Sequence, residues 1–209
     1  STSALPAMGP WGGIARIVGV TPLAVGIPTG DKPSFVMDAA FAACARGKVV
    51  VYHQKGEPIP DNWALDAQGQ PTTDAGAALQ GLLRPVGDYK GVNVSMAMGV
   101  LSTLLSGAGY GTRLGSVDEG PNAGRDGHFM MAVEKEECGE AGDFREEMDA
   151  VIDEIHTSGR APGVERIYSA GELEAETAVS YQRDGIALND ETLAELENTA
   201  SSLGVALTL

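Results

Sequence analysis

A glycine-rich stretch between Gly107 and Gly127 is the feature that most constrains how this chain can fold. It holds seven glycines, too many for the interior of a helix or a strand, because glycine loses more backbone freedom on folding than any other residue. We therefore expect the stretch to be a loop. Strand-type and helix-type patterns alternate before it, whereas helix-type patterns dominate after it. No βαβ unit repeats, so the sequence predicts a mixed α/β fold.

Four segments have the pattern of strands. Residues 16–28 alternate like two strands interrupted at Pro22, and residues 35–38 have the apolar character of a short buried strand. After the glycine-rich stretch, residues 128–133 and 165–168 are each predicted to form a short strand.

Helical patterns cover much of the remaining chain. Residues 39–55 fit a helix or a strand, because Val49, Val50 and Val51 are β-branched, but the alanine-rich start of the segment favours a helix. The turn-rich stretch 56–85 has a single helical segment at residues 74–80. Further helices are predicted at residues 90–105, 144–155 and 172–182, and from Asn189 or Asp190 to Leu203.

Two of these helices carry a prediction about which side chains face the interior. In the helix at residues 90–105, small residues imply burial on more than one face. Its apolar positions at helical spacing are Met96, Val100, Leu101, Leu104 and Leu105. In the last helix, the positions expected to face inward are Leu193, Leu196, Ala200 and Leu203.

The charge of the chain argues against two classes of partner. Its net charge is -15 and its pI is about 4.4, so it repels the phosphates of nucleic acids and anionic membranes. Cys44 and Cys138 match neither a metal-ligand spacing nor a disulfide framework, so we predict free thiols and no metal site. The sequence also lacks a long apolar run and a signal pattern. These features predict a cytoplasmic protein without nucleic-acid or membrane partners.

Several short motifs follow one another in the order found in one enzyme family. The most specific reads Trp-Ala-Leu-Asp at residues 63–66 and is followed by Gly69 and by Pro-Thr-Thr-Asp at residues 71–74. The others are Pro-Trp-Gly-Gly at 10–13, Arg-Gly-Lys-Val at 46–49, Tyr-Lys-Gly at 89–91, Leu-Ser-Gly at 105–107 and Gly-Glu at 171–172. Together they resemble the malate/L-lactate dehydrogenase family over nearly the whole chain.

The resemblance implies a particular fold. The family builds its NAD(P) site on a mixed sheet that is not a Rossmann sheet, and it lacks the Gly-x-Gly-x-x-Gly fingerprint, as does this chain. The resemblance also implies that this is the C-terminal portion of such a protein, completed by a missing N-terminal chain. Residues 1–135 would then form a central region like the cofactor domain. Residues 136–209 would form a C-terminal helical region that packs on the missing part.

The resemblance further implies an activity and site residues. Family members are usually dimers that reduce small 2-oxo acids or oxidise 2-hydroxy acids, with a catalytic His and a substrate-binding Arg upstream of the position of Ser1. If this activity is kept, the residues that would contact NAD or NADP are Asp38, Lys90, Gly171 and Glu172. The candidates for binding the small-molecule substrate are Asn122, Arg125 and His128.

Several departures from the family motifs fall in the cofactor region. Residues 39–42 read Ala-Ala-Phe-Ala where the family usually has Met-Ala-Thr-Ser, which removes two hydroxyl groups, each worth about 1 kcal/mol as a hydrogen-bond partner. Asp88 replaces a glycine of the family's Gly-Gly-x-Lys-Gly turn and puts a carboxylate where a phosphate would approach. Gly99 stands where the family usually has Glu. These changes predict a weakened or lost cofactor site, so the leading hypothesis has no cofactor.

The leading hypothesis from the sequence starts at Ser1. It supposes that processing of a longer precursor exposes this residue, whose hydroxyl acts as nucleophile with its own α-amine as general base. The catalytic candidates are Ser1, Thr2 and Ser3. Backbone amides near Gly12 and Gly13 or the Asn93 side chain would stabilise the oxyanion. The predicted function is an autoprocessed hydrolase of amide or related acyl bonds, partnered by the N-terminal chain of the same precursor in a homodimer of such pairs.

Two alternatives stay open. The first is an NAD(P)-dependent oxidoreductase of small 2-oxo and 2-hydroxy acids, with the catalytic His and Arg supplied by the missing chain. The second is a non-enzymatic scaffold subunit that has lost its site.

Overall fold

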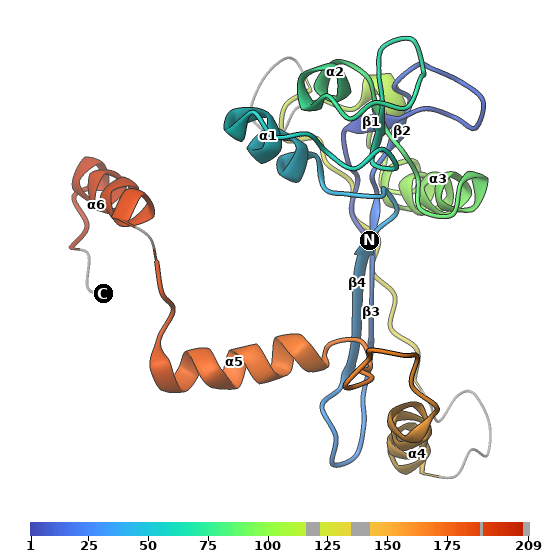
Figure 1. Ribbon diagram of the computed structural model, residues 1–209, viewed down its shortest axis with the longest axis vertical. Coiled ribbons are helices and arrows are strands. Elements are labelled where there is room, and N and C mark those ends of the chain that lie inside the picture. Colours follow the sequence, from blue (N-terminus) through green and yellow to red (C-terminus); the bar gives the residue numbers. More distant parts are fainter. Residues whose placement is uncertain (116–121, 135–142, 189, 207–209) are drawn as a thin grey trace.

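The computed structural model describes residues 1–115, 122–134, 143–188 and 190–206, and it confirms the mixed α/β fold class (Figure 1). Its strands are β1 (Pro6–Met8), β2 (Val18–Gly19), β3 (Pro22–Ile27), β4 (Phe35–Ala40), β5 (Ala64–Leu65) and β6 (Leu82–Leu83). Its helices are α1 (Arg46–Lys55), α2 (Ala75–Gln80), α3 (Tyr89–Thr103), α4 (Phe144–Thr157), α5 (Glu172–Asp184) and α6 (Asp190–Leu203). The described parts of the glycine-rich stretch form a loop with a 3-10 turn at Gly111–Arg113, as predicted.

The described strands pair as three antiparallel ladders, β1 with β2, β3 with β4, and β5 with β6. The predicted interruption at Pro22 is confirmed, because β2 ends at Gly19 and β3 begins at Pro22, where a proline without an N–H group is tolerated. β3 and β4 form a long hairpin that extends away from the other strands (Figure 1). The prediction that the strand at residues 35–38 is buried is wrong for β4. Its residues alternate between half-buried and exposed, so only one face of the hairpin is packed.

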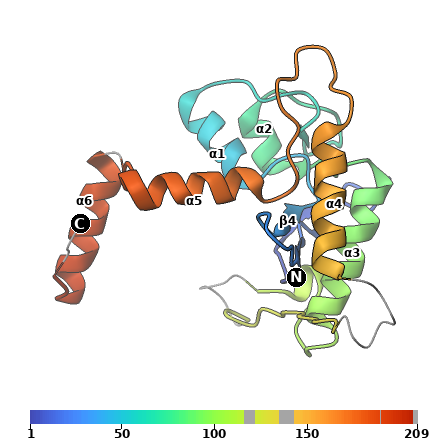
Figure 2. The same ribbon diagram turned by 90° about the horizontal axis from the view of Figure 1, so that it is seen from below.

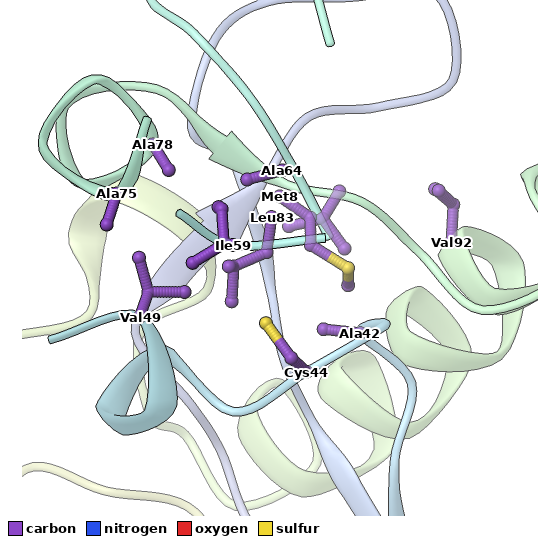
Figure 3. Close-up of a cluster of buried hydrophobic side chains, with 11 residues drawn as sticks. Met8, Ala42, Cys44, Val49, Ile59, Ala64, Ala75, Ala78, Leu83 and Val92 are labelled. Carbon is purple, nitrogen blue, oxygen red and sulfur yellow. The ribbon is translucent and has the colours of Figure 1, made fainter. Parts of the chain in front are cut away.

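The hydrophobic core lies where α1 and α2 pack against β1, β5 and β6 (Figure 3). Met8, Val49 and Ala64 are at most 1% exposed, and burying a side chain of the size of valine or methionine stabilises the fold by about 1.5–3 kcal/mol. Tyr52 packs edge-on against Trp63, with ring centroids 5.4 Å apart. The Trp-Ala-Leu-Asp motif at residues 63–66 therefore serves the core.

α3 packs through its small residues, and the prediction that its apolar stripe is buried is wrong. The buried positions are Gly91, Val92, Ser95, Gly99, Ser102 and Thr103. Met96, Val100 and Leu104 are exposed. A Cβ atom at Gly99 would lie 2.7 Å from the ring of Tyr110, so the helix backbone approaches its neighbours too closely for a larger side chain. The glycine that replaces the family's usual Glu therefore leaves the space that the Tyr110 ring occupies.

The helix predicted at residues 39–55 begins only at Arg46. Ala39 and Ala40 complete β4, and the segment after them pairs with the segment before α3 instead of coiling. The Ala43 N–H donates to the Arg84 carbonyl at 2.7 Å, and the Val86 N–H donates to the Phe41 carbonyl at 2.9 Å. Alanine content alone did not reveal this pairing, because it depends on a segment more than 40 residues away.

Two predicted strands are absent from the described residues. At residues 128–133, pairing is limited to the first two residues. His128 forms an isolated bridge with Thr2, Phe129 exchanges backbone hydrogen bonds with Ser1, and Met130 is 90% exposed. Residues 165–168 form no strand either. Both segments have strand-type composition, but no described strand lies alongside to form a ladder with them.

α4 is held on the loop of the β3–β4 hairpin by its carboxylates. Asp149 accepts hydrogen bonds from the N–H groups of Gly30 at 3.0 Å and Asp31 at 2.8 Å, and Asp153 pairs with Lys32 at 2.5 Å. These contacts fix α4 beside the hairpin although more than 110 residues separate the partners in sequence.

α5 leads away from the hairpin, and α6 follows the far end of α5, away from the strands in both views (Figures 1 and 2). The prediction that α6 turns its leucines inward is wrong for Leu196 and Leu203, which are exposed. Asn189, one of the two predicted caps of α6, lies outside the described residues, as does Cys138. None of the described helices is long and apolar enough to cross a membrane.

Candidate functional site

Residues 1–3 form one side of a short antiparallel ladder with residues 127–129. The Ser1 nitrogen donates to the Phe129 carbonyl at 3.0 Å, and the Phe129 N–H donates to the Ser1 carbonyl at 2.9 Å. The Ser3 N–H donates to the Gly127 carbonyl at 2.8 Å, and the Gly127 N–H donates to the Ser3 hydroxyl at 3.1 Å. The ladder ties the first residues to the end of the glycine-rich loop.

The Ser1 hydroxyl is engaged in structural hydrogen bonds. It donates to the Pro22 carbonyl at 2.7 Å and accepts from the Ser102 hydroxyl at 3.0 Å. A peptide carbonyl is too weak a base to take the hydroxyl proton, so these contacts do not activate Ser1 as a nucleophile. The groups expected to stabilise an oxyanion lie elsewhere. Gly12 and Gly13 line a cavity whose lining does not include Ser1, and Asn93 is exposed on α3.

The three substrate-binding candidates lie in one surface segment that runs into this ladder, and His128 belongs to the ladder itself. The Arg125 N–H donates to the Asn122 carbonyl at 3.2 Å, which closes a turn, and the Asn122 amide reaches the Arg113 carbonyl at 3.4 Å. The side chains of Arg125 and His128 are exposed. Their role in substrate binding stays a prediction.

A groove between β4 and the start of α5 brings together two of the predicted cofactor residues. Asp38 of β4 and Gly171 beside α5 both line it, and its volume is about 730 Å³. Volumes of roughly 300–1,000 Å³ are typical of sites for small molecules. Sequence reasoning missed two further lining residues, Leu173 and Glu174, although both directly follow the Gly-Glu motif. We call this the β4–α5 groove.

Gly171 determines how closely α5 approaches β4. Its φ is +94°, a value that residues with a side chain rarely adopt, and a Cβ atom there would lie 3.0 Å from both the Cβ and the nitrogen of Val36. The neighbouring Ala170 carbonyl accepts a hydrogen bond from the Val36 N–H at 2.9 Å. The glycine is therefore required by the backbone conformation and by the narrow contact.

Glu172 lies next to the groove but does not line it. Its side chain is 6% exposed, its Oε2 accepts from the Ser169 N–H at 2.9 Å, and its Oε1 lies 2.7 Å from His156 Nε2. Burial alone would raise the pKa of this carboxyl, but the Ser169 hydrogen bond, His156 and the guanidinium of Arg166 outweigh it and hold the pKa of Glu172 below its ordinary value. Glu172 thereby ties the start of α5 to α4.

The turn before α3 holds Asp88, the one non-glycine residue with a positive φ in the described part of the chain. Its φ of 57° and ψ of -128° are those of the first corner of a type II′ turn, where glycine is preferred. The Lys90 N–H donates to the Gly87 carbonyl at 3.2 Å and closes the turn. The family's glycine at this position is therefore explained by the backbone conformation of the turn, which glycine adopts without strain. Lys90 is exposed and does not line the β4–α5 groove.

Replacing Asp88 with glycine is expected to raise the free energy of unfolding by about 1 kcal/mol. Relief of the strained conformation, roughly 1–3 kcal/mol, exceeds the roughly 0.5–1 kcal/mol that glycine adds to the entropy of the unfolded chain. Thermal unfolding followed by circular dichroism measures the change. Asp88→Asn is the control, because it removes the charge and keeps the strain. If the Asp88→Gly variant is less stable than the parent, the backbone of Asp88 is not strained.

A second cavity, of about 440 Å³, lies against the same turn. Residues 11–13 of the Pro-Trp-Gly-Gly motif line it together with Arg84 and Asp88. Trp11 is 60% exposed and its ring packs edge-on against Tyr89, with centroids 6.4 Å apart. Sequence reasoning missed this cavity, because only the tertiary fold brings Trp11 next to Arg84.

Comparison with known proteins decides between the hypotheses. The sequence profile of malate/L-lactate dehydrogenases matches residues 1–197. The chain belongs to this family. The L-sulfolactate dehydrogenase of Methanothermobacter thermautotrophicus is 34% identical over 202 residues, which cover 97% of this chain and 57% of that protein. The malate dehydrogenase of Pyrococcus horikoshii is 34% identical over 213 residues, which cover 98% of this chain and 58% of that protein.

A solved structure supports the same assignment. The sulfolactate dehydrogenase from Methanocaldococcus jannaschii matches this fold with a TM-score of 0.82 at 32% identity, over 98% of this chain and 58% of that one. The chain therefore spans a little more than half the length of these malate/L-lactate dehydrogenase relatives.

Family membership corrects the leading hypothesis from the sequence. These relatives are dehydrogenases, and nothing in their names points to a hydrolase, so the prediction of an autoprocessed hydrolase is wrong. The hydroxyl of Ser1, bonded to Pro22, is consistent with this correction. The expectation of no cofactor is wrong as well, because the relatives are dehydrogenases, and a dehydrogenase needs a hydride carrier.

Proposed function

We propose that the protein to which this chain belongs is an NAD(P)-dependent oxidoreductase that interconverts small 2-oxo acids and 2-hydroxy acids. Its family and the names of its relatives support this reading. The observation that carries it is the β4–α5 groove, because Asp38 and Gly171 meet there although 133 residues separate them in sequence. A site assembled in this way favours an enzyme over a scaffold that has lost its site.

The β4–α5 groove fits one nucleoside portion of a dinucleotide. Its volume of about 730 Å³ is sufficient, and the Asp38 carboxylate can accept hydrogen bonds from ribose hydroxyls. Apolar side chains such as Met37 and Leu173 supply contact for a base. The nicotinamide ring supplies the hydride chemistry when it is bound. We propose that Lys90, near the N-terminal end of α3, attracts the phosphates and that residues of this chain hold and orient the cofactor.

Exposed apolar side chains support a proposal about partners. Those that are at least half exposed include Leu104 and Leu105 directly after α3, Leu173 and Val179 on α5, and Leu203 on α6. Apolar surface of this kind marks interfaces. We propose that residues 1–135 form the cofactor region and that residues 136–209 form a helical region. The helical region would pack on a part of the protein outside this chain. That part would correspond to the portion of the relatives that this chain does not match.

The same proposal covers the remaining parts of the site. The part of the protein outside this chain supplies the catalytic His and the substrate-binding Arg, and the surface segment with Asn122, Arg125 and His128 contributes to substrate specificity. The protein is proposed to be a cytoplasmic homodimer. Its buried free thiol at Cys44 is compatible with a reducing compartment.

Titration of the intact protein with NADH and NADPH tests the proposed function. We expect saturable enhancement of nicotinamide fluorescence for at least one dinucleotide, with a Kd below about 1 mM, and oxidation of the bound cofactor on addition of the 2-oxo acid of malate or sulfolactate. The Ser1→Ala variant is the control and is expected to keep both properties, because its hydroxyl only makes structural contacts. Absence of saturable binding of either dinucleotide would exclude the proposal.

A further inference from the structure

We infer that the β4–α5 groove holds the adenosine ribose of the cofactor and selects NAD(H) over NADP(H). This inference rests on the proposed function and names the cofactor more closely. The two cofactors differ only in a phosphate on the 2′-oxygen of that ribose, so the charge around the ribose decides between them.

The charged side chains that line the groove are both acidic. They are Asp38 from β4 and Glu174 from the first turn of α5, and none of the described residues that line the groove is Lys, Arg or His. Neither carboxylate has a hydrogen bond or an ion pair within the described part of the chain. Both therefore keep their acceptor sites for a bound molecule.

The cations nearest to the groove in sequence are already paired. Lys32 precedes the lining residue Pro33, and its ammonium group lies 2.5 Å from Asp153 of α4. Arg166 pairs with Glu176 at 2.7 Å and lies over the ring of Tyr168 at 4.5 Å. Neither cation is free to neutralise a phosphate in the groove. The net charge of -15 adds repulsion of the same sign.

A ribose diol and a ribose 2′-phosphate meet this lining in opposite ways. Carboxylates are acceptors, so Asp38 and Glu174 can each accept hydrogen bonds from the 2′- and 3′-hydroxyls of NAD(H). A 2′-phosphate replaces one donor by a group with about two negative charges and no donor, next to two carboxylates. The closeness of α5 to β4 at Gly171 limits the space in which these like charges could separate.

Calorimetric titration of the intact protein with NAD⁺ and NADP⁺ tests the inference. At low ionic strength we expect NAD⁺ to bind at least about tenfold more tightly, because two like-charged groups face the 2′-phosphate. Near 1 M salt, where the screening length falls to about 3 Å, the preference is expected to shrink severalfold. Adenosine 5′-monophosphate and adenosine 2′,5′-bisphosphate serve as fragments of the two cofactors. The fragment without the 2′-phosphate is expected to bind more tightly.

Neutral variants locate the preference at the groove. The double variant Asp38→Asn with Glu174→Gln is expected to reduce the NAD⁺ over NADP⁺ ratio about tenfold, because it removes both charges and keeps both shapes. Asp31→Asn is the matched control, since Asp31 lies on the same hairpin outside the lining and its loss is expected to leave the ratio within about twofold.

The outcomes separate this inference from the proposed function. If NADP⁺ binds the parent as tightly as NAD⁺, or if the preference is the same in the double variant, the inference is wrong and the dehydrogenase proposal stands. If neither dinucleotide binds, the proposed function itself fails.

Discussion

Replacing Gly171 with alanine is expected to lower the free energy of unfolding by about 2 kcal/mol and to weaken NADH binding about tenfold. The left-handed φ of +94° costs a residue with a Cβ roughly 1–3 kcal/mol. The new Cβ would also lie 3.0 Å from Val36, so α5 must move away from β4. Such a shift changes the width of the groove that we assign to the cofactor. Thermal unfolding and NADH titration measure the two effects.

Gly163→Ala is the matched control for this variant. Gly163 has a similar φ of +81°, but a Cβ atom there would have no other atom within 4 Å. It therefore bears the conformational cost alone and should not affect NADH binding. If the two variants lose the same stability and both keep the parent affinity, the close approach at Gly171 has no role in the site.

Replacing Glu172 with glutamine is expected to lower the free energy of unfolding by about 2 kcal/mol, which corresponds to a fall in Tm of about 4–8 °C for a chain of this size. The variant keeps an acceptor for the Ser169 N–H but loses its charge opposite His156 and Arg166. Because these partners lie on α4 and on the segment before α5, the loss is expected to loosen the start of α5. Glu154→Gln, at an exposed position of α4, is expected to change the free energy by less than about 0.5 kcal/mol.

The effect of Glu172 should also depend on pH in a defined direction. Its partners hold the pKa of the folded carboxyl below the ordinary glutamate value, so the folded state prefers the ionised form. The stabilisation is therefore present above the ordinary pKa of about 4.3 and is lost as the pH falls through the lower pKa of the folded state. The difference in Tm between the parent and Glu172→Gln should be full at pH 7 and shrink below about pH 4. A difference that is constant down to pH 3 would contradict this assignment.

The sequence predicted the helices well and the strands poorly. The helix at residues 74–80 was predicted almost to the residue, because Asp74 caps it and its side chain accepts from the Ala77 N–H at 2.9 Å. Capping is local, so it can be read from neighbouring residues. The segment 128–133 has the composition of a strand and yet pairs only at its first two residues, His128 and Phe129, because a strand also needs a partner from elsewhere in the chain.

Chemistry was harder to predict than structure. The sequence allows Ser1 a nucleophilic role because its side chain is a hydroxyl, and only the fold shows that this hydroxyl donates to the Pro22 carbonyl. The sequence at Asp88 predicts an obstacle to phosphate, whereas its backbone angles show a strained turn. Residue type follows from the sequence, but the surroundings that determine its chemistry depend on the fold.

The sequence by itself determined the family, the order of most helices and the glycine-rich loop, because motifs, caps and glycine content are properties of neighbouring residues. The tertiary structure alone decided which face of α3 is buried, since the proximity of Tyr110 to Gly99 selects small residues against the hydrophobic pattern. It alone also placed Asp38 beside Gly171 and Glu174. The spacing of residues along a chain fixes local conformation, whereas a groove depends on which distant segments come into contact.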